Sequence, residues 1–290
     1  MMTFIMKPGI LLWMIFNLQF FSNAQNLEQT IEFADNQFNN KNYQLAVKEY
    51  QRALFFAGGK YTDYLYRQIA NSFFVNSQFE QALYFYELSY KTSNSDSLKF
   101  EMIIARSLCY LYLKDFKHSI LELANIPDSS DEYFKTRKSF YQAISYYGSE
   151  DYEKSKNSFL ALVSESDQKS RAEIEKLFTT KKYLFKPNPN TAKVLSILLP
   201  GSGQIYAGDI KNSLNSLLLT GSLVLLGIVM VQEYTILDAF LTAFPWFMRY
   251  YRGGFESAYK IALDKRAIRR DNTYKQVLEI IKESNQIPEN

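Results

Sequence analysis

Small, aromatic and bulky side chains recur at a fixed spacing between residues 27 and 167. An aromatic residue comes at intervals of 36, 37 and 36 residues, at Tyr43, Phe79, Phe116 and Tyr152. Small residues lie nine positions before and three positions after each aromatic one, at Ala34, Ala46, Ala70, Ala82, Ser107, Ser119, Ala143 and Ser155. Four positions after the second small residue of each set comes a bulky residue, at Tyr50, Tyr86, Leu123 and Phe159. Small side chains let paired helices approach closely and large ones fill the groove between neighbours, so the pattern predicts four helix–turn–helix pairs.

The pattern resembles the tetratricopeptide repeat, a helix pair of about 34 residues with small and aromatic residues at these offsets. The resemblance covers residues 25–167 in four units that are slightly longer than the family's. It implies an all-α solenoid with a concave surface that holds a peptide or protein partner. The inner-helix positions expected to line this surface are Arg67, Asn71, Phe74, Ile104, Leu108, Phe140, Ile144 and Tyr147. The alternative is that several of these side chains belong to the core of the solenoid.

Some members of that family grip a C-terminal carboxylate with basic and amide side chains. Asp35, Glu101 and Leu108 stand at the equivalent positions here, so we do not expect this mode of binding. Residues 168–182 have the pattern of one more amphipathic helix, which we expect to cap the open end of the stack. Residues 186–190 contain two prolines separated by asparagine and are predicted to be a linker. Residues 168–190 are therefore assigned to a cap and a linker.

The hydrophobic pattern changes abruptly after this linker. Residues 192–199 are largely apolar, and residues 213–231 form a stretch of nineteen residues without a charge, close to the ~20 residues that cross a bilayer core. Residues 235–251 form a second, weaker span that ends in an aromatic and basic cluster typical of a membrane interface. These features predict a C-terminal transmembrane helical module over residues 191–263.

A Pro-Gly-x-Gly-Gln-x-Tyr-x-Gly motif joins the first apolar segments of this module. It consists of Pro200, Gly201, Gly203, Gln204, Tyr206 and Gly208. The motif resembles the turn of the TM2-like membrane hairpins of bacterial envelope proteins, to which no established biochemical activity belongs. The alternative is a nucleotide-binding loop, but the required lysine or third glycine is absent. We expect the glycines to permit a sharp bend, with Gln204 and Tyr206 bonded to backbone groups that the bend exposes.

The number of membrane crossings decides where the basic C-terminal tail lies. With two crossings and an exported repeat domain, the tail would also be outside, against the positive-inside rule. We therefore expect a third crossing at residues 192–206, which places the basic amphipathic tail, residues 264–290, in the cytoplasm. That tail is suited to an anionic membrane surface or to packing as a terminal helix. Asp238 lies close to the predicted turn between the spans, so we expect a solvated carboxylate.

The first 24 residues have the features of a secretory signal peptide. An apolar segment follows Lys7, and Ser22 and Ala24 occupy the positions of small residues in a cleavage site. The alternative is an uncleaved signal anchor. In either case we expect the repeats to be exported to the periplasm and the chain to be held in the inner membrane of a bacterium.

Composition excludes several classes of function. Residues 26–167 carry a net charge of −4 and residues 168–290 a net charge of +6, and no basic run is dense enough for a nucleic-acid surface. One cysteine, Cys109, and one histidine, His118, exclude an intramolecular disulfide and a Cys/His zinc cluster. His118 is expected to be a surface residue. We therefore predict no enzyme activity, no cofactor, no metal and no nucleic-acid partner.

Together, these features suggest a membrane-anchored, periplasm-facing scaffold for protein–protein interaction in the bacterial cell envelope, with a protein or peptide and the lipid bilayer as partners. The alternative is an accessory subunit of a membrane transport or insertion complex, in which the C-terminal module is the functional part.

Overall fold

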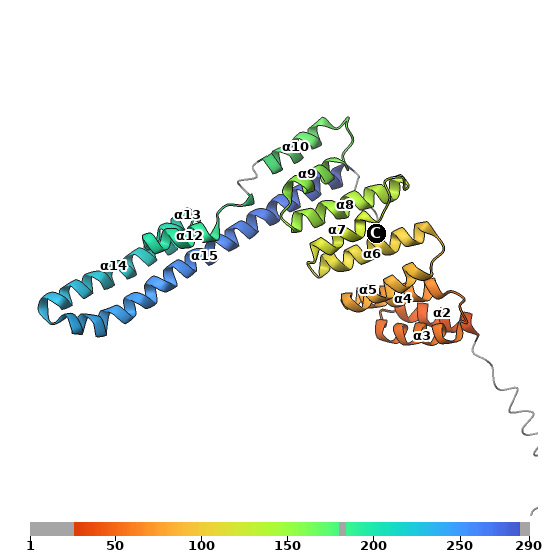
Figure 1. Cartoon of the computed structure of the whole chain (residues 1–290), viewed down its shortest axis with the longest axis horizontal. Helices are drawn as coiled ribbons and strands as arrows, with labels where there is room; N and C mark the ends of the chain where they lie inside the picture. The colour runs from red at the N-terminus through yellow and green to blue at the C-terminus, as the bar shows by residue number, and fades with distance from the viewer. Residues whose placement is uncertain (1–25, 180–183, 285–290) are drawn as a thin grey trace, which may run out of the picture. The chain divides into compact units, whose positions relative to one another are not determined.

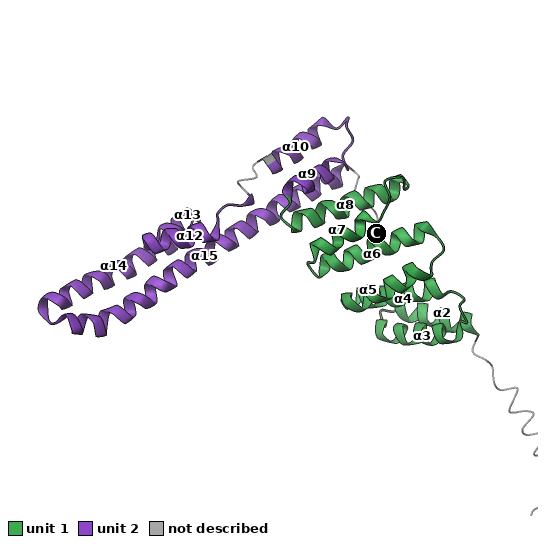
Figure 2. Cartoon of the chain, in the orientation of Figure 1, with its two compact units in different colours: residues 1–151 green, residues 152–290 purple. Residues whose placement is uncertain are grey.

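The computed structural model describes residues 26–179 and 184–284, and within these ranges it contains helices and no strand. The all-α prediction is therefore confirmed for the described residues. The predicted signal peptide lies outside them. The chain divides into two compact units, residues 1–151 and 152–290, which Figure 2 shows in different colours. This boundary falls before the second helix of the fourth predicted pair and not at residue 167.

Unit 1 is built from helices that pack in chain order, each against the next one (Figure 1). They are α2 (Leu27–Asn39), α3 (Tyr43–Phe56), α4 (Thr62–Val75), α5 (Phe79–Thr92), α6 (Asp96–Tyr112), α7 (Phe116–Ala124) and α8 (Glu132–Gly148). Turns of three residues join α2 to α3, α4 to α5 and α6 to α7. Because so short a connection cannot span the length of a helix, the two members of each pair run antiparallel.

The turns inside the pairs have the same backbone geometry. The residue two positions before each recurring aromatic has a positive φ angle: 64° at Lys41, 60° at Ser77, 60° at Lys114 and 66° at Glu150. The next amide closes the preceding helix, as when Asn42 N donates to Gln37 O at 2.9 Å. A left-handed residue followed by such a bond is a common way to end a helix. The recurring aromatics are the first residues of α3, α5, α7 and α9 (Tyr152–Leu160), as the sequence period requires.

Burial follows the same period. All eight recurring small residues are completely buried, and the bulky Tyr50, Tyr86, Leu123 and Phe159 are at most 4% exposed. A side chain larger than alanine or serine at the small positions would force the paired helices apart. The predicted register of small and large residues is therefore the packing register of the helices.

The single cysteine lies in this core. Cys109 on α6 is completely buried, and burial raises the pKa of its thiol to about 12. Since the thiolate is the reactive form, Cys109 in the folded protein is expected to resist maleimide at neutral pH and to react within minutes once urea unfolds the chain. Mass spectrometry after timed quenching measures this difference. Equal labelling rates with and without urea would show that α6 is not packed as described.

Unit 2 contains α9, α10 (Gln168–Thr179), α12 (Pro189–Leu198), α13 (Ser202–Tyr206), α14 (Ile210–Glu233) and α15 (Ile236–Glu283). The end of the predicted linker is helical: the Asn188 side chain caps α12 and Pro189 is its first residue. An N–H at this position has no acceptor within the helix, so proline, which lacks one, is well tolerated there. The predicted boundary at residue 263 falls inside α15, which continues without a break and contains Pro245. The basic tail is therefore an extension of the second apolar helix.

The C-terminal half of α15 packs within unit 2. Val277 and Ile281 are completely buried, and α10 lies against this part of the chain. Arg270 Nε donates to Leu184 O at 3.0 Å, and its guanidinium lies over the rings of Tyr152 and Phe185. Of the two roles expected for residues 264–290, the described part adopts that of a packed terminal helix.

Candidate functional site

The apolar positions predicted to contact a partner in unit 1 are largely engaged with the core. Ile104 is 1% exposed, and Leu108, Phe140 and Ile144 pack against the same buried cluster. Phe74 packs with the ring of Phe79, their centroids 5.5 Å apart. Ile104 therefore cannot reach a partner, and the alternative that several of these side chains form the core holds at this position.

The polar positions behave differently. Arg67, Asn71 and Tyr147 are half-buried, and the guanidinium of Arg67 lies 5.6 Å from the ring centre of Tyr64. Asn71 accepts a hydrogen bond from Tyr86 Oη at 2.8 Å and donates to Gln68 at 2.9 Å. Asn71 thus joins α4 to α5 and has part of its hydrogen-bonding capacity committed to the fold.

A hydrogen-bond network that the sequence analysis missed begins one helix pair earlier. Asp35 on α2 accepts from Tyr50 Oη at 2.6 Å and from Tyr64 Oη at 2.9 Å, and Gln68 donates to Tyr64 Oη at 3.0 Å. Burial, followed by the bond to Asp35, raises the pKa of the Tyr50 phenol. The recurring tyrosines could have indicated the network, because their hydroxyls are expected to find partners when buried.

Ion pairs continue this cross-helix bonding. Arg106 on α6 pairs with Glu87 on α5 and with Glu122 on α7. The Arg137 side chain on α8 is 9% exposed and pairs with Glu101 on α6 at 2.7 Å. Glu101, one of the residues that argued against a carboxylate-binding site, therefore has a structural partner. These pairs fix neighbouring helices in one register.

The glycine motif of unit 2 forms a compact joint between α12 and α13. Gly201 has a φ angle of 92°, a backbone conformation that favours glycine. A Cβ on Gly203 would lie 1.9 Å from the carbonyl oxygen of Ala192, so α13 can approach α12 only because residue 203 is glycine. The Ser202 hydroxyl donates to Leu195 O at 2.7 Å and to Leu199 O at 2.8 Å. Side chains thus satisfy carbonyl groups that the end of α12 leaves open.

Gln204 connects this joint to α15. Its side chain is 1% exposed; Oε1 accepts from the Ser196 hydroxyl at 2.8 Å, and Nε2 donates to Gly254 O at 2.8 Å. Ser196 Oγ also accepts from the amide of Gly203 at 3.0 Å. The Gln204 side chain therefore links α12, α13 and α15, and the amide of Gly203 has an acceptor within the joint.

The rest of the motif has smaller structural roles. Tyr206 Oη accepts a hydrogen bond from Asn188 N at 3.1 Å. Gln204 and Tyr206 thus bond to backbone groups in α15 and at the start of α12, while Ser196 and Ser202 bond to the backbone groups at the bend. Gly208 has a φ angle of 79° and allows the chain to turn into α14, while Pro200 is half-buried. The motif positions helices, and the amides of Ser202, Gly203 and Ile205 have acceptors within the joint.

Helix α14 has the properties of a membrane span. It is the only helix among the described residues that is long and apolar enough to cross a bilayer, and 6% of its most apolar 18-residue window is buried. In a protein surrounded by water, such an apolar helix would normally be covered. Its exposed leucine and valine side chains therefore call for an apolar environment.

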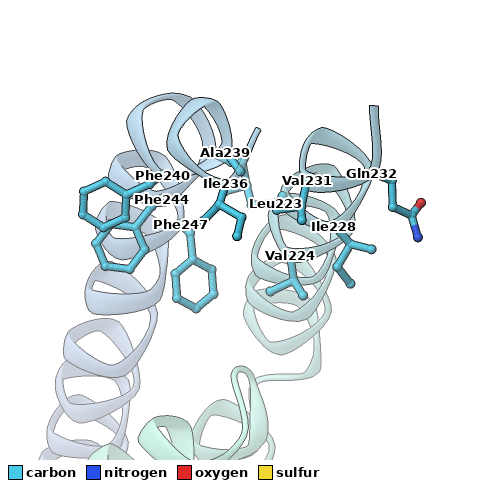
Figure 3. A pocket seen from close by; sticks show the side chains of 12 residues that line it. Leu223, Val224, Ile228, Val231, Gln232, Ile236, Ala239, Phe240, Phe244 and Phe247 are labelled. Atoms are coloured by element: carbon cyan, nitrogen blue, oxygen red, sulfur yellow. The ribbon is translucent and has the colours of Figure 1, made fainter. Parts of the chain in front are cut away.

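The first part of α15 packs beside α14 and has a similar surface. Phe240, Leu241, Phe244 and Trp246 are exposed. An apolar groove of about 530 Å³ lies between the two helices. Figure 3 shows side chains that line it, among them Val224, Ile228 and Phe247. Gly227 lies opposite Ala243, where an added Cβ would be 3.9 Å away. Helices α14 and α15 therefore form a hairpin with an apolar outer surface.

Asp238 caps this hairpin at the turn. Thr235 Oγ1 accepts from Asp238 N at 3.2 Å, and the carboxylate of Asp238 accepts from Thr235 N at 3.2 Å. This reciprocal capping box stabilises the start of α15. Asp238 is exposed, as predicted, and its role is structural. His118 is also exposed and bonds to Asp115 at 2.6 Å.

The third crossing expected at residues 192–206 is not formed by a helix. Helix α12 has ten residues and α13 has five, with a bend between them. At 1.5 Å per residue, α12 is about 15 Å long, half of the ~30 Å hydrocarbon core. The apolar composition of this segment alone was misleading, because the helix ends at Leu198 and the chain bends before α13. Val194, Leu198 and Leu199 are exposed. Residues 192–206 therefore form two short helices with a bend between them and not one spanning helix, and the number of crossings stays a prediction.

Among the described residues, no group of three or more histidine, cysteine, aspartate or glutamate side chains is placed to hold a metal ion. Neither a family model, nor a curated protein, nor a solved structure gives a significant match to this chain.

Proposed function

We propose that this protein is a scaffold of the bacterial inner membrane, in which a tetratricopeptide-like repeat domain holds a protein partner and the α14–α15 hairpin anchors it in the bilayer. The observation that carries the proposal is the exposed apolar surface of that hairpin, in a chain that also contains a helical-repeat unit. A hydrophobic surface of this extent is stable in lipid and unstable in water. In this proposal the repeat domain provides the surface that binds the partner, and the hairpin holds that domain at the membrane.

The α12–α13 segment enters the apolar layer and returns to the same side. Tyr251 Oη donates to Ile197 O at 2.7 Å, and Ser196, Ser202 and Gln204 satisfy other polar groups at the bend. Non-helical backbone is tolerated at membrane depth when protein groups satisfy it in this way. The joint therefore acts as a re-entrant segment that stiffens the base of the hairpin.

A hairpin crosses the membrane an even number of times. The C-terminal half of α15 then lies on the same side as α9, α10 and the repeat domain, because no apolar span separates α8 from α10. The secretory features of the first 24 residues favour the periplasm for that side. The basic side chains of α15 are then held there by the packing of the terminal helix and by headgroups of the membrane.

Site-specific photo-crosslinking in living cells tests the scaffold role. A crosslinking amino acid at Arg67, on the first helix of the second pair, is expected to give a discrete covalent adduct in the carbonate-resistant membrane fraction. The same amino acid at Gln51, an exposed position on α3, is the matched control and should give none. Equal adducts at both positions, or none at either, would contradict the binding surface. Release of the protein by carbonate would contradict the anchor.

A further inference from the structure

A polar pocket of about 330 Å³ lies between α14 and α15, at the opposite end of the hairpin from the turn. Asn215 and Ser216 line it from α14, and Arg249, Tyr250 and Ser257 line it from α15. Much of the hairpin surface between the pocket and the turn is apolar, with Leu225, Val229, Phe240 and Leu241 exposed. Unpaired polar groups are costly next to lipid. The polar groups of this pocket are therefore expected to have a polar ligand.

Its depth matches a membrane interface. Arg249 lies thirteen residues after the start of α15, which at 1.5 Å per residue is about 20 Å from the turn. Ser216 lies seventeen residues before the end of α14, about 25 Å from the turn. If the turn lies near one face of a ~30 Å core, the pocket is close to the headgroups of the other face.

The pocket has donors available for an anion. Arg249 is its one charged residue and has no ion-pair partner among residues 26–179 and 184–284; its guanidinium lies 5.8 Å from the ring centre of Trp246. The Ser216 hydroxyl is buried without a hydrogen-bond partner. Buried hydroxyls are rarely left unpaired in this way, so the Ser216 hydroxyl is a second donor, besides the Arg249 guanidinium, for a ligand in this pocket.

Nearby carboxylates do not compete for these donors. Asp209 accepts hydrogen bonds from the side-chain Nδ2 of Asn212 at 2.7 Å and from the backbone N of Asn212 at 3.0 Å. Glu256 pairs with Lys193 at 2.8 Å. Gly253 adds no side chain to the pocket, and a Cβ on Gly254 would lie 2.7 Å from the Ser216 hydroxyl. The pocket is therefore open, and its charge is positive.

We propose that this pocket binds the phosphate of an anionic phospholipid in the surrounding leaflet. The guanidinium and the hydroxyl groups are the donors, and the neighbouring apolar groove accommodates the acyl chains. A lipid is favoured over a soluble phosphate because the pocket opens beside exposed apolar side chains at interfacial depth. This inference rests on the membrane placement proposed above, and it adds a specific lipid to it.

Quenching of Trp246 fluorescence tests the proposal. The chain contains two tryptophans, Trp13 and Trp246, so full-length protein with Trp13→Phe has one reporter, next to Arg249. The protein is reconstituted in phosphatidylcholine vesicles containing a small fraction of phosphatidylglycerol, with either lipid brominated in the upper acyl chain. We expect brominated phosphatidylglycerol to quench Trp246 as if enriched about fivefold over its bulk fraction, the size of one charge interaction.

Three variants make the measurement specific to the pocket. Arg249→Gln should abolish the enrichment, and Ser257→Ala, which leaves the neighbourhood of Trp246 intact, should reduce it. Arg252→Gln removes an equal charge three residues further along α15. Arg252 does not line the pocket, so this variant should preserve the enrichment. Equal enrichment in Arg249→Gln and Arg252→Gln would overturn the proposal.

Further outcomes separate the possible ligands and the two proposals. If millimolar inorganic phosphate removes the enrichment, the site takes soluble phosphate and the lipid assignment is wrong. If both brominated lipids quench Trp246 in proportion to their bulk fractions, the membrane anchor stands and the lipid site does not. If neither lipid quenches Trp246, the membrane placement itself fails.

Discussion

Replacing Gly203 with alanine is expected to be among the most damaging single substitutions in unit 2. The new Cβ would lie 1.9 Å from the carbonyl oxygen of Ala192 and 2.5 Å from the Ser196 hydroxyl. A carbonyl inside α12 cannot rotate away, so α12 and α13 must separate and the Gln204 bonds to Ser196 and Gly254 are lost. We expect a loss of at least about 3 kcal/mol, the upper range for overpacking. The melting temperature in detergent, followed by size-exclusion chromatography, measures it.

Gly221→Ala is the matched control for this substitution. Gly221 lies in α14, and a Cβ there meets no atom within 4 Å, so the melting temperature should stay the same or rise slightly because alanine favours helix. Equal destabilisation by both substitutions would show that the joint is not close-packed. The same reasoning limits functional tests of the motif: substituting Gly203 or Gln204 cannot separate a scaffold from a transport subunit, since it damages the fold in either case.

The second large effect is expected at Tyr50 in the repeat unit. Tyr50 is completely buried and bonds to Asp35 at 2.6 Å. Tyr50→Ala should cost about 3–5 kcal/mol, as for other buried aromatic residues. Tyr50→Phe should cost about 1–2 kcal/mol, because the ring remains and Tyr64 still donates to Asp35 at 2.9 Å. Pulse proteolysis of the full-length protein in urea gives both values.

Tyr84 provides the comparison for these variants. It lies on α5 and is 61% exposed, so Tyr84→Ala and Tyr84→Phe should change the free energy of unfolding by less than about 0.5 kcal/mol. If Tyr50→Phe were as mild as Tyr84→Phe, the Asp35 network would not contribute to stability. The graded loss from phenylalanine to alanine at Tyr50 separates the hydrogen bond from the packing of the ring.

The repeat unit could be predicted from the sequence because its signals are local and recur. Tyr43, Phe79, Phe116 and Tyr152 each begin a helix, and the small residues around them are buried. The network around Asp35 was harder to foresee, since it joins residues 15 and 29 positions apart. Their side chains meet only after the helices have packed.

The joint between α12 and α13 could be predicted from the sequence only in part. The glycines of the motif correctly indicated a bend, but the bond from Gln204 to Gly254 joins residues 50 positions apart and has no local signature. Two prolines suggested a linker through residue 190, yet Pro189 starts α12. Proline ends a helix from within and is well tolerated at its first residue, so its presence alone did not locate the boundary.

The two-crossing topology is the central claim, and cysteine labelling in intact cells tests it most directly. Single cysteines at Asn94, at Glu233 in the hairpin turn and at Lys282 near the end of α15 are introduced in a Cys109→Ala background and treated with a membrane-impermeant maleimide. We predict labelling at Asn94 and Lys282, with Glu233 protected until the inner membrane is permeabilised. Labelling at only one of Asn94 and Lys282, or the same accessibility at all three positions, would contradict the membrane hairpin.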